Sequence, residues 1–202
     1  LYAGCLTSPG TVVRISLTDG SQTQLTFATG NNRIWSVVTH GGYLYAGLDV
    51  TTGKIVRVDL SDFSTMVVFT HGSGSNRVED LVVDSTYLYA AFYRSGGLSG
   101  KLARIALADF ATVTTVTLAA GEVGPQALVI DAQYLYAGLD VTPGRIVRVA
   151  LSDFSTVSSL DLGTGEDAIQ GMALAGTVIY VGTDTTPGKI VRVDTGSFTE
   201  TD

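Results

Sequence analysis

The chain has 202 residues, of which 45% are apolar, so it has enough apolar side chains for a packed core and is not an intrinsically disordered polymer. Its formal net charge of −7, from 19 acidic and 12 basic residues, argues against nucleic acid and against anionic membrane surfaces as partners. No apolar run approaches the roughly 20 residues of a membrane-spanning helix, and the single cysteine, Cys5, excludes an internal disulfide and a cysteine metal site.

A Leu-Tyr pair followed by Ala and a small residue recurs along the chain. It stands at 1–4, 44–47, 88–91 and 135–138, and a softer Ile-Tyr-Val-Gly copy stands at 179–182. The steps between copies are 43, 44, 47 and 44 residues. A fixed period of this size predicts one supersecondary unit used repeatedly. We place the units near 1–43, 44–87, 88–134, 135–178 and 179–202.

Each repeat contains four short segments rich in β-branched or aromatic residues and bounded by Gly, Pro, Asp or Ser. In chain order, the fourth repeat has strands at 127–131, 134–138, 145–149 and 157–162, joined by a turn at 132–133, a loop at 140–144 and a turn at 152–156. These lengths and compositions are typical of strands. No segment shows the 3.6-residue period of an amphipathic helix, so helix is not expected.

Four short antiparallel strands in each repeat are the layout of a β-propeller blade. Stacked blades cover both faces of each sheet, which explains why Ile55-Val56 and Ile146-Val147 are apolar at consecutive positions. We therefore predict an all-β protein, a β-propeller of about five four-stranded blades that is incomplete at both ends. A β-solenoid is the alternative.

We treat residues 1–202 as a single repeat domain. The chain starts in the second strand of its first blade and stops near the fourth strand of its fifth. We therefore expect an excerpt of a longer chain, or an assembly in which another chain supplies the missing strands. Open sheet edges of this kind invite strand addition.

A second motif follows the Leu-Tyr-Ala copies. Thr-Ser-Pro-Gly leads into an apolar strand at 7–15, and related copies stand at 51–58, 142–149 and 185–193. This pattern resembles the YVTN-type propeller repeats of bacterial and archaeal surface proteins. It is more similar to the Thr-Ser-Pro-Gly-Lys-Val-Val-Lys-Ile-Asp repeats of secreted multi-repeat proteins. The resemblance covers essentially the whole chain and implies a propeller and an extracellular or cell-surface location. It does not select a function, because propellers host enzymes, lectins and scaffolds alike.

Nine of the 12 basic residues occupy two repeated positions, where each is expected to do the same structural work in every blade. One position, in the third strand, holds Arg14, Arg57, Arg104, Arg148 and Arg192, and the other, after the loop Gly, holds Lys54, Lys101, Arg145 and Lys189. We expect the strand arginines to pair with the turn carboxylates or to lay their stems on apolar neighbours. The turn carboxylates are Asp19, Asp62, Asp109 and Asp153.

The residues that do not follow the repeat gather in loops on one face. In an antiparallel blade, the loop before the first strand and the loop between the second and third strands lie on the same side. The candidates for ligand binding on this face are Arg33, Trp35, Arg77, Glu79, Asp80, Arg94, Glu122, Glu166, Asp167 and Gln170. Variation concentrated on one face is typical of a scaffold that carries a site there. Drift of solvated loop residues is the alternative for each, and a core position is the alternative for Trp35.

Three repeated aspartates, Asp49, Asp140 and Asp184, precede the loop glycines. We expect each to cap its turn through the backbone. A Ca²⁺ site is the alternative, because hard cations bind several oxygen atoms. No other cofactor is expected. The two histidines, His40 and His71, lie in no catalytic elbow and form no cluster for a transition metal.

We predict a non-enzymatic binding or adhesion propeller of a secreted or cell-surface protein, which recognises a glycan or a protein through the variable face. The first alternative is a structural subunit of a filament, sheath or surface layer that assembles through its open edge strands. The second is a hydrolase that uses two carboxylates from Glu79, Asp80, Glu122 and Glu166. Binding predicts that a change of Arg77 or Glu79 removes ligand capture and leaves the melting temperature unchanged.

Overall fold

The computed structural model describes residues 1–72, 74–94 and 96–201. Ser73, Ser95 and Asp202 lie outside the described residues, and the first two belong to the variable segments at 70–77 and 93–97. The described part consists of strands, turns and loops, which confirms the predicted all-β class. Among the same residues, no helix has the length and apolar character needed to cross a membrane.

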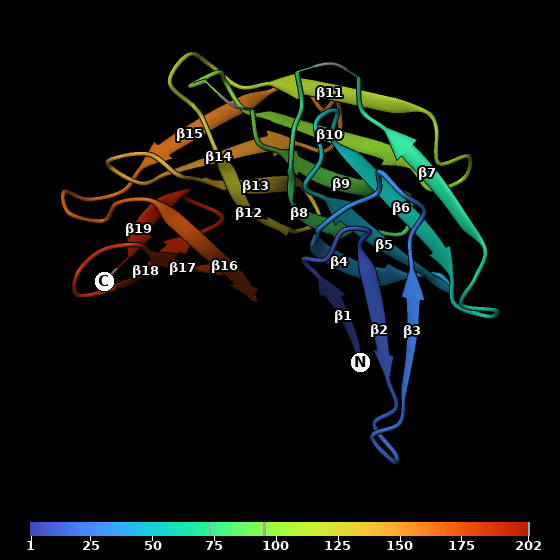
Figure 1. The fold of residues 1–202 in the computed structure, drawn as a ribbon. Helices are drawn as coiled ribbons and strands as arrows, with labels where there is room; N and C mark the ends of the chain where they lie inside the picture. The colour runs from blue at the N-terminus through green and yellow to red at the C-terminus, as the bar shows by residue number, and fades with distance from the viewer. Residues whose placement is uncertain (73, 95, 202) are drawn as a thin grey trace. The chain divides into compact units, whose positions relative to one another are not determined.

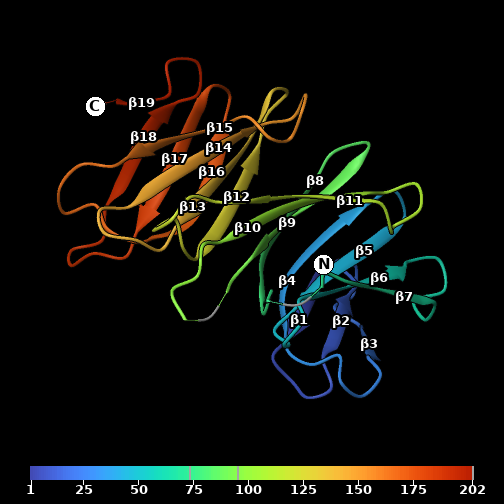
Figure 2. The ribbon, with the colours of Figure 1, turned by 90° about the horizontal axis from the view of Figure 1, so that it is seen from above.

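The strands form five sheets, one with three strands and four with four (Figures 1 and 2). The first contains β1 (Tyr2–Cys5), β2 (Thr11–Ile15) and β3 (Gln22–Thr26). The second contains β4 (Ile34–His40), β5 (Tyr43–Leu48), β6 (Lys54–Asp59) and β7 (Met66–Thr70). The third contains β8 (Val78–Val83), β9 (Tyr87–Phe92), β10 (Lys101–Ala106) and β11 (Val113–Thr117). The fourth contains β12 (Pro125–Ile130), β13 (Tyr134–Leu139), β14 (Arg145–Ala150) and β15 (Val157–Asp161). The fifth contains β16 (Ile169–Ala175), β17 (Val178–Thr183), β18 (Ile190–Asp194) and β19 (Thr199–Thr201).

Within each sheet, strands that follow one another in the chain are neighbours. The pairing is antiparallel, as in β13–β14, where Tyr136 lies opposite Arg148. A β-solenoid would instead pair equivalent strands of successive coils in parallel, so this antiparallel order rules out the alternative fold. The first sheet has three strands and β19 has only three residues, as the phase of the repeat predicted.

Contacts between residues divide the chain into two compact units. The first comprises Leu1–Phe92 with Arg104–Val113, and the second comprises Tyr93–Ala103 together with the chain from Thr114 onwards. The first unit contains a core cluster around Leu44, Val56 and Phe63. The second contains a cluster around Tyr136, Val181 and Phe198. Each unit therefore has apolar packing of its own.

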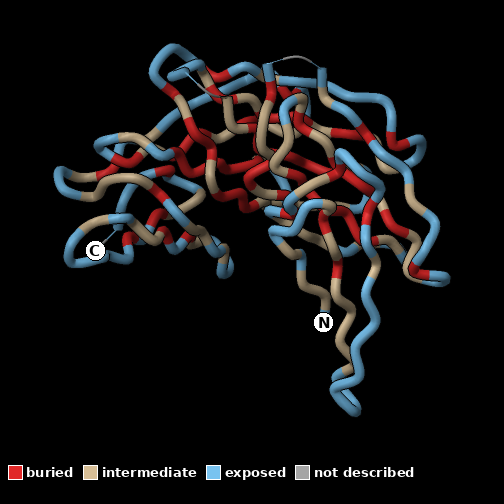
Figure 3. The backbone as a smooth tube through the Cα atoms, in the orientation of Figure 1, coloured by how far each residue is buried: buried red, intermediate tan, exposed pale blue. Residues whose placement is uncertain are grey.

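The middle strands are buried on both faces. Ile55 and Val56 are both fully buried although they point to opposite faces of β6, and the same holds for Ile146 and Val147 in β14. Figure 3 shows the pattern along the chain, with buried backbone in the strands and exposed backbone at the turn tips. The prediction from consecutive apolar residues is confirmed.

The repeated strand arginines stack on aromatic rings. The Arg57 guanidinium lies 4.8 Å from the ring centroid of Tyr43 and 4.9 Å from that of Phe110. Arg148 lies 4.6 Å from the ring of Tyr134 and 4.2 Å from that of Phe198. These are cation–π distances. The arginine therefore joins a tyrosine of its own sheet to the turn phenylalanine of the next sheet.

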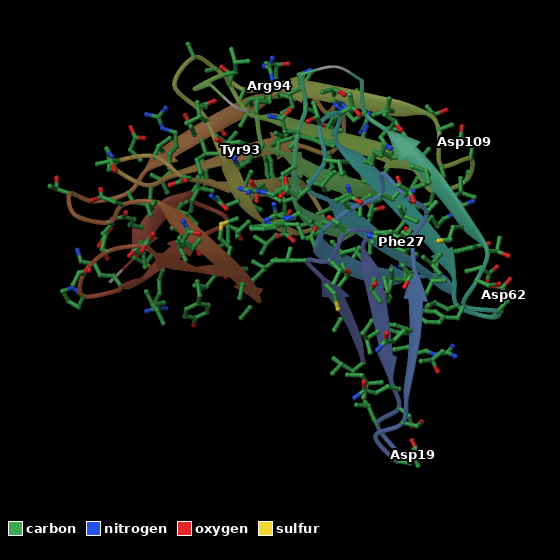
Figure 4. All side chains as sticks on the ribbon, in the orientation of Figure 1. Asp19, Phe27, Asp62, Tyr93, Arg94 and Asp109 are labelled. Carbon is green, nitrogen blue, oxygen red and sulfur yellow. The ribbon has the colours of Figure 1, made fainter. Side chains whose placement is uncertain are left out.

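Of the two contacts expected for the strand arginines, Arg57 and Arg148 show the apolar one, and the turn aspartate bonds within its own turn. Asp109 Oδ1 accepts the amides of Ala111 and Thr112, and Oδ2 accepts the Thr112 hydroxyl at 2.6 Å. These bonds, the Thr112 hydroxyl first, lower the pKa of Asp109 to about 2. Both carboxylate oxygens are already engaged within the turn, which leaves the arginine to the rings. Figure 4 labels Asp19, Asp62 and Asp109 at three such turns.

A second repeated polar contact closes the turn between the first two strands. The Tyr89 hydroxyl donates to Asp84 Oδ2 at 2.7 Å, and the Tyr136 hydroxyl donates to Asp131 Oδ2 at 2.8 Å. Both tyrosines are almost completely buried. The pair satisfies a buried phenol that would otherwise lose its hydrogen bond to water.

Candidate functional site

Four sheets carry a β-bulge near the start of their first strand. The register shifts between Ile34 and Ser36, between Val78 and Asp80, between Pro125 and Ala127, and between Ile169 and Gly171. The bulged residues are Trp35, Glu79, Gln126 and Gln170. A bulge redirects a side chain and is common beside functional sites. Three of these four residues were candidates from sequence, and Gln126 was missed although it aligns with Gln170.

In the first unit, Trp35, Arg77 and Glu79 form a contact cluster, which we call the Trp35 cluster. The Arg77 guanidinium lies 4.2 Å from the Trp35 ring centroid. Arg77 Nε donates to Glu79 Oε1 at 2.7 Å, and Arg77 Nη2 contacts the same oxygen. Trp35 is 40% exposed, so its indole is a surface residue and not part of the core. The Trp35 cluster therefore places a cation over an aromatic ring at the protein surface.

Glu79 lies beneath this surface with its side chain fully buried. Its Oε2 atom is buried and has no hydrogen-bond partner among the described residues. Burial raises the pKa of Glu79, and this effect outweighs the hydrogen bond and charge of Arg77. Loss of Arg77 would leave a buried carboxylate without its cation. A change of Arg77 is therefore expected to lower stability, which replaces the expectation that the melting temperature would stay unchanged.

Arg33 and Asp49 form an ion pair in the same unit. Arg33 Nη1 lies 3.3 Å from Asp49 Oδ2, and the Asp49 amide donates to the Arg33 carbonyl at 2.9 Å. Asp49 also forms a backbone bridge with Arg77, which brings the ion pair next to the Trp35 cluster. This part of the first unit thus brings together an exposed aromatic ring, two arginines, the carboxylate of Asp49 and the buried carboxylate of Glu79.

The repeated aspartates were expected to cap their turns. The carboxylates of Asp49 and Asp140 instead bind side chains from another loop or strand. The carboxylate of Asp49 pairs with Arg33, and Asp140 Oδ2 accepts the Gln126 side-chain amide at 3.2 Å. Asp184 contributes its backbone amide, which donates to the carbonyls of Ala168 and Asp167. Across residues 1–72, 74–94 and 96–201, no three His, Cys, Asp or Glu side chains come together in a way that could hold a metal ion.

Two predicted site residues, Glu122 and Glu166, have a repeated structural role. Glu122 Oε2 accepts the Ala119 amide at 2.9 Å, and Glu166 Oε2 accepts the Gly163 amide at 3.0 Å. Their other oxygens lie 3.6 Å from Arg145 Nη1 and 3.7 Å from Lys189 Nζ. In an earlier repeat, Lys54 Nζ donates to Asn31 Oδ1 at 3.3 Å in the same way.

These contacts explain the basic residue after the loop Gly, which binds the polar side chain of the preceding loop. The signal was present in the sequence, because the two Gly-Glu pairs at 121–122 and 165–166 are 44 residues apart, which is one repeat. The two glutamates therefore follow the repeat, although the sequence analysis placed them in the variable set.

Glu200 was missed by sequence reasoning. Its Oε1 accepts the Gly163 amide at 2.8 Å, the same amide that Glu166 Oε2 accepts. Burial and the neighbouring Glu166 raise the pKa of Glu200. No periodic signal marks Glu200, because only the fold brings β19 beside the loop at 163–166.

The remaining candidates make other contacts. Asp80 Oδ1 accepts the amide of the next residue, Leu81. Arg94, labelled in Figure 4 on the loop between β9 and β10, donates from Nη1 to the Ser99 carbonyl at 3.1 Å. Gln170 is exposed in β16, and the Asp167 carbonyl accepts the Asp184 amide at 3.2 Å. Asp80 and Arg94 thus each bond within their own strand or loop.

Comparison with known proteins gives no match to a protein family and no match to a curated protein. Solved structures do match. The chain is similar to the computationally designed Ika8 protein, with a TM-score of 0.69 and 12% identity over 98% of this chain and 56% of that chain. It is similar to the β-propeller domain of Myceliophteria thermophila Cps50 (Swd1), with a TM-score of 0.66 and 18% identity over 97% of this chain and 63% of that domain.

The computationally designed Ika4 protein also matches, with a TM-score of 0.59 and 11% identity over 80% of this chain and 90% of that chain. The chain therefore spans less than two thirds of Ika8 and of the Cps50 domain. At these identities the likeness shows the fold alone. The protein is an all-β chain with the β-propeller fold, as its repeat predicted.

Proposed function

We propose that this chain is a non-enzymatic binding propeller that recognises a protein or a glycan through the variable face of its first unit. The observation that carries the proposal is the Trp35 cluster. An exposed indole, a guanidinium stacked on it and a buried carboxylate beneath it form a rigid surface with aromatic and charged character. Trp and Arg are the residues most enriched among binding hot spots.

The wider biological setting belongs to the same proposal. The Thr-Ser-Pro-Gly and Leu-Tyr-Ala repeats resemble those of secreted and surface propellers. We place the chain in an extracellular or cell-surface protein related to the YVTN-type repeats. Adhesion would then be the role of the binding face.

Replacement of Trp35 by alanine is expected to weaken binding about tenfold or more, because it removes the stacking surface. The measurement is the affinity of the purified chain for arrays of neutral and uronic-acid oligosaccharides and for a displayed peptide library. Tyr180→Ala is the matched control, since Tyr180 is also 40% exposed but lies in the second unit. Its binding should equal that of the wild type.

Arg77→Met separates folding from recognition. It should lower the free energy of unfolding by about 1–2 kcal/mol at neutral pH, since Glu79 loses its cation and takes up a proton instead. Trp35→Ala should leave the melting temperature close to that of the wild type. The proposal is contradicted if neither probe class binds, or if binding is the same with and without the Trp35 indole.

A structural subunit of a larger assembly is the second candidate. Ile55 and Ile146 are fully buried, whereas Ile190 at the same repeat position in β18 is 77% exposed. An apolar strand face left open in this way favours association. Self-assembly predicts concentration-dependent oligomers in light scattering that Ile190→Glu abolishes. A monodisperse monomer at all concentrations would contradict it.

A further inference from the structure

A pocket of about 370 Å³ lies in the first unit at the turn between β4 and β5. This turn follows the C-terminal end of β4, whereas Trp35 lies at the N-terminal end, so the pocket is separate from the Trp35 cluster. Its lining includes His40, Tyr43, Tyr45, Thr86 and Leu107. The volume is at the small end of the range for ligand sites, about 300–1,000 Å³.

The repeat shows what is unusual about this turn. In the third sheet, Asp84 Oδ1 accepts the amides of Thr86 and Tyr87, and Oδ2 accepts the Tyr89 hydroxyl. In the fourth sheet, Asp131 makes the same three bonds with Gln133, Tyr134 and Tyr136. The fold therefore places a carboxylate against the buried tyrosine hydroxyl in both of these sheets.

In the second sheet the carboxylate is replaced. His40 stands at the position of Asp84 and Asp131, and Tyr45 stands at the position of Tyr89 and Tyr136. Gly41 and Gly42, with φ of 57° and 83°, form a two-residue hairpin turn there, a geometry that needs no aspartate to close it. Tyr45 is only 2% exposed and lines the pocket. The structure gives its hydroxyl no hydrogen bond among the described residues.

The surroundings of Tyr45 suit a small organic anion that carries an apolar group. Burial raises the pKa of Tyr45, so the phenol stays protonated and can donate at neutral pH. The guanidinium of Arg57, stacked on the Tyr43 ring, contributes positive charge nearby. The carboxylates of Asp84 and Asp59 are hydrogen-bonded to Tyr89 and Ser61. Tyr43, Leu107 and Ala108 supply apolar wall.

We infer that this pocket binds a small carboxylic acid, whose carboxylate takes the place that Asp84 and Asp131 occupy in the next two sheets and accepts the Tyr45 hydroxyl. An aryl or alkyl group attached to that carboxylate lies against Tyr43 and Leu107. His40 forms the polar side of the pocket. The site is independent of the binding face proposed above, because it uses none of the same residues.

The probes are benzoate and its neutral analogue benzamide, titrated into the ¹⁵N-labelled chain and followed by NMR. Benzoate should bind in a saturable way, with shifts centred on the turn at 40–43, and at least about tenfold more tightly than benzamide. N-acetylphenylalanine and N-acetylphenylalanine amide form a second pair of probes. The carboxylate of the first mimics the C-terminus of a peptide, and the amide lacks that charge. Tighter binding of this acid than of benzoate would identify a peptide end as the source of the carboxylate.

Two variants test the position of the carboxylate. Tyr45→Phe should weaken benzoate binding about tenfold or more. His40→Asp should abolish benzoate binding because the chain then supplies its own carboxylate. The melting temperature of His40→Asp should be equal to or higher than that of the wild type. Tyr136→Phe is the matched control, since Asp131 already occupies that hydroxyl, and it should bind benzoate like the wild type. Three results would overturn the inference. The first is equal affinity for benzoate and benzamide, and the second is undiminished benzoate binding by a folded His40→Asp variant. The third is the absence of saturable binding of both benzoate and N-acetylphenylalanine.

Discussion

Replacement of Phe110 by alanine is expected to lower the free energy of unfolding by about 3–5 kcal/mol. Phe110 is 3% exposed, and its ring centroid lies 5.7 Å from that of Tyr45 and 5.9 Å from that of Phe69. The Arg57 guanidinium stacks on the Phe110 ring at 4.9 Å from its centroid. Alanine removes the ring that joins the second sheet to the third and leaves a cavity among side chains that cannot close over it.

The backbone at this position provides a sharper test. Phe110 has a φ of 51°, in the left-handed region that disfavours every residue with a Cβ atom. Glycine avoids that strain, so Phe110→Gly should be about 1 kcal/mol more stable than Phe110→Ala, the reverse of their usual order in strands. Urea denaturation of both variants measures the difference. Equal stability, or a more stable alanine variant, would mean that the turn relaxes to a negative φ.

Gly138→Ala should cost about 2–3 kcal/mol of unfolding free energy. A Cβ atom added at Gly138 would overlap Ile169 Cγ2, lie 3.0 Å from Ile169 Cβ and lie 3.3 Å from Met172 Sδ. A β-branched isoleucine has little rotamer freedom with which to retreat. The glycine of the Leu-Tyr-Ala-Gly motif thus allows the first strand of the next sheet to approach closely.

Gly182 is the matched control, since it occupies the same repeat position in β17. An added Cβ atom there would meet only the Gly171 carbonyl oxygen, at 3.8 Å. Gly182→Ala should therefore change the free energy of unfolding by less than about 0.5 kcal/mol. Thermal and urea denaturation of the two alanine variants distinguish close packing from an intrinsic need for glycine. Similar losses at both positions would contradict the packing explanation.

Much of the fold could be predicted because it depends on local pattern repeated at a fixed distance. The Leu-Tyr-Ala period gave the number of sheets, and consecutive apolar pairs such as Ile55-Val56 gave strands buried on both faces. The missing strand of the first sheet followed from the phase of the same repeat. Three of the four bulged residues were among the candidates because they stand at or beside the ends of the variable loops.

The partners of individual side chains could not be predicted in the same way. Arg57 binds the ring of Phe110, which is 53 positions away in the sequence, because the neighbouring sheet brings it there while the turn aspartates are already engaged. Glu122 and Glu166 looked variable until Arg145 and Lys189 were seen beside them. Glu200 meets Gly163 only through the pairing of β18 with β19.

The sequence by itself determined the period, the strand class and the burial of the strands, because alternation and spacing act within a few residues of one another. The tertiary structure alone decided which charges are paired, that Glu79 is buried beneath an exposed Trp35, and that Tyr45, whose counterparts Tyr89 and Tyr136 bond to an aspartate, lines a pocket. The physical reason is that burial, electrostatics and cavities depend on groups brought together from neighbouring sheets, and a repeat in the sequence does not record those distances.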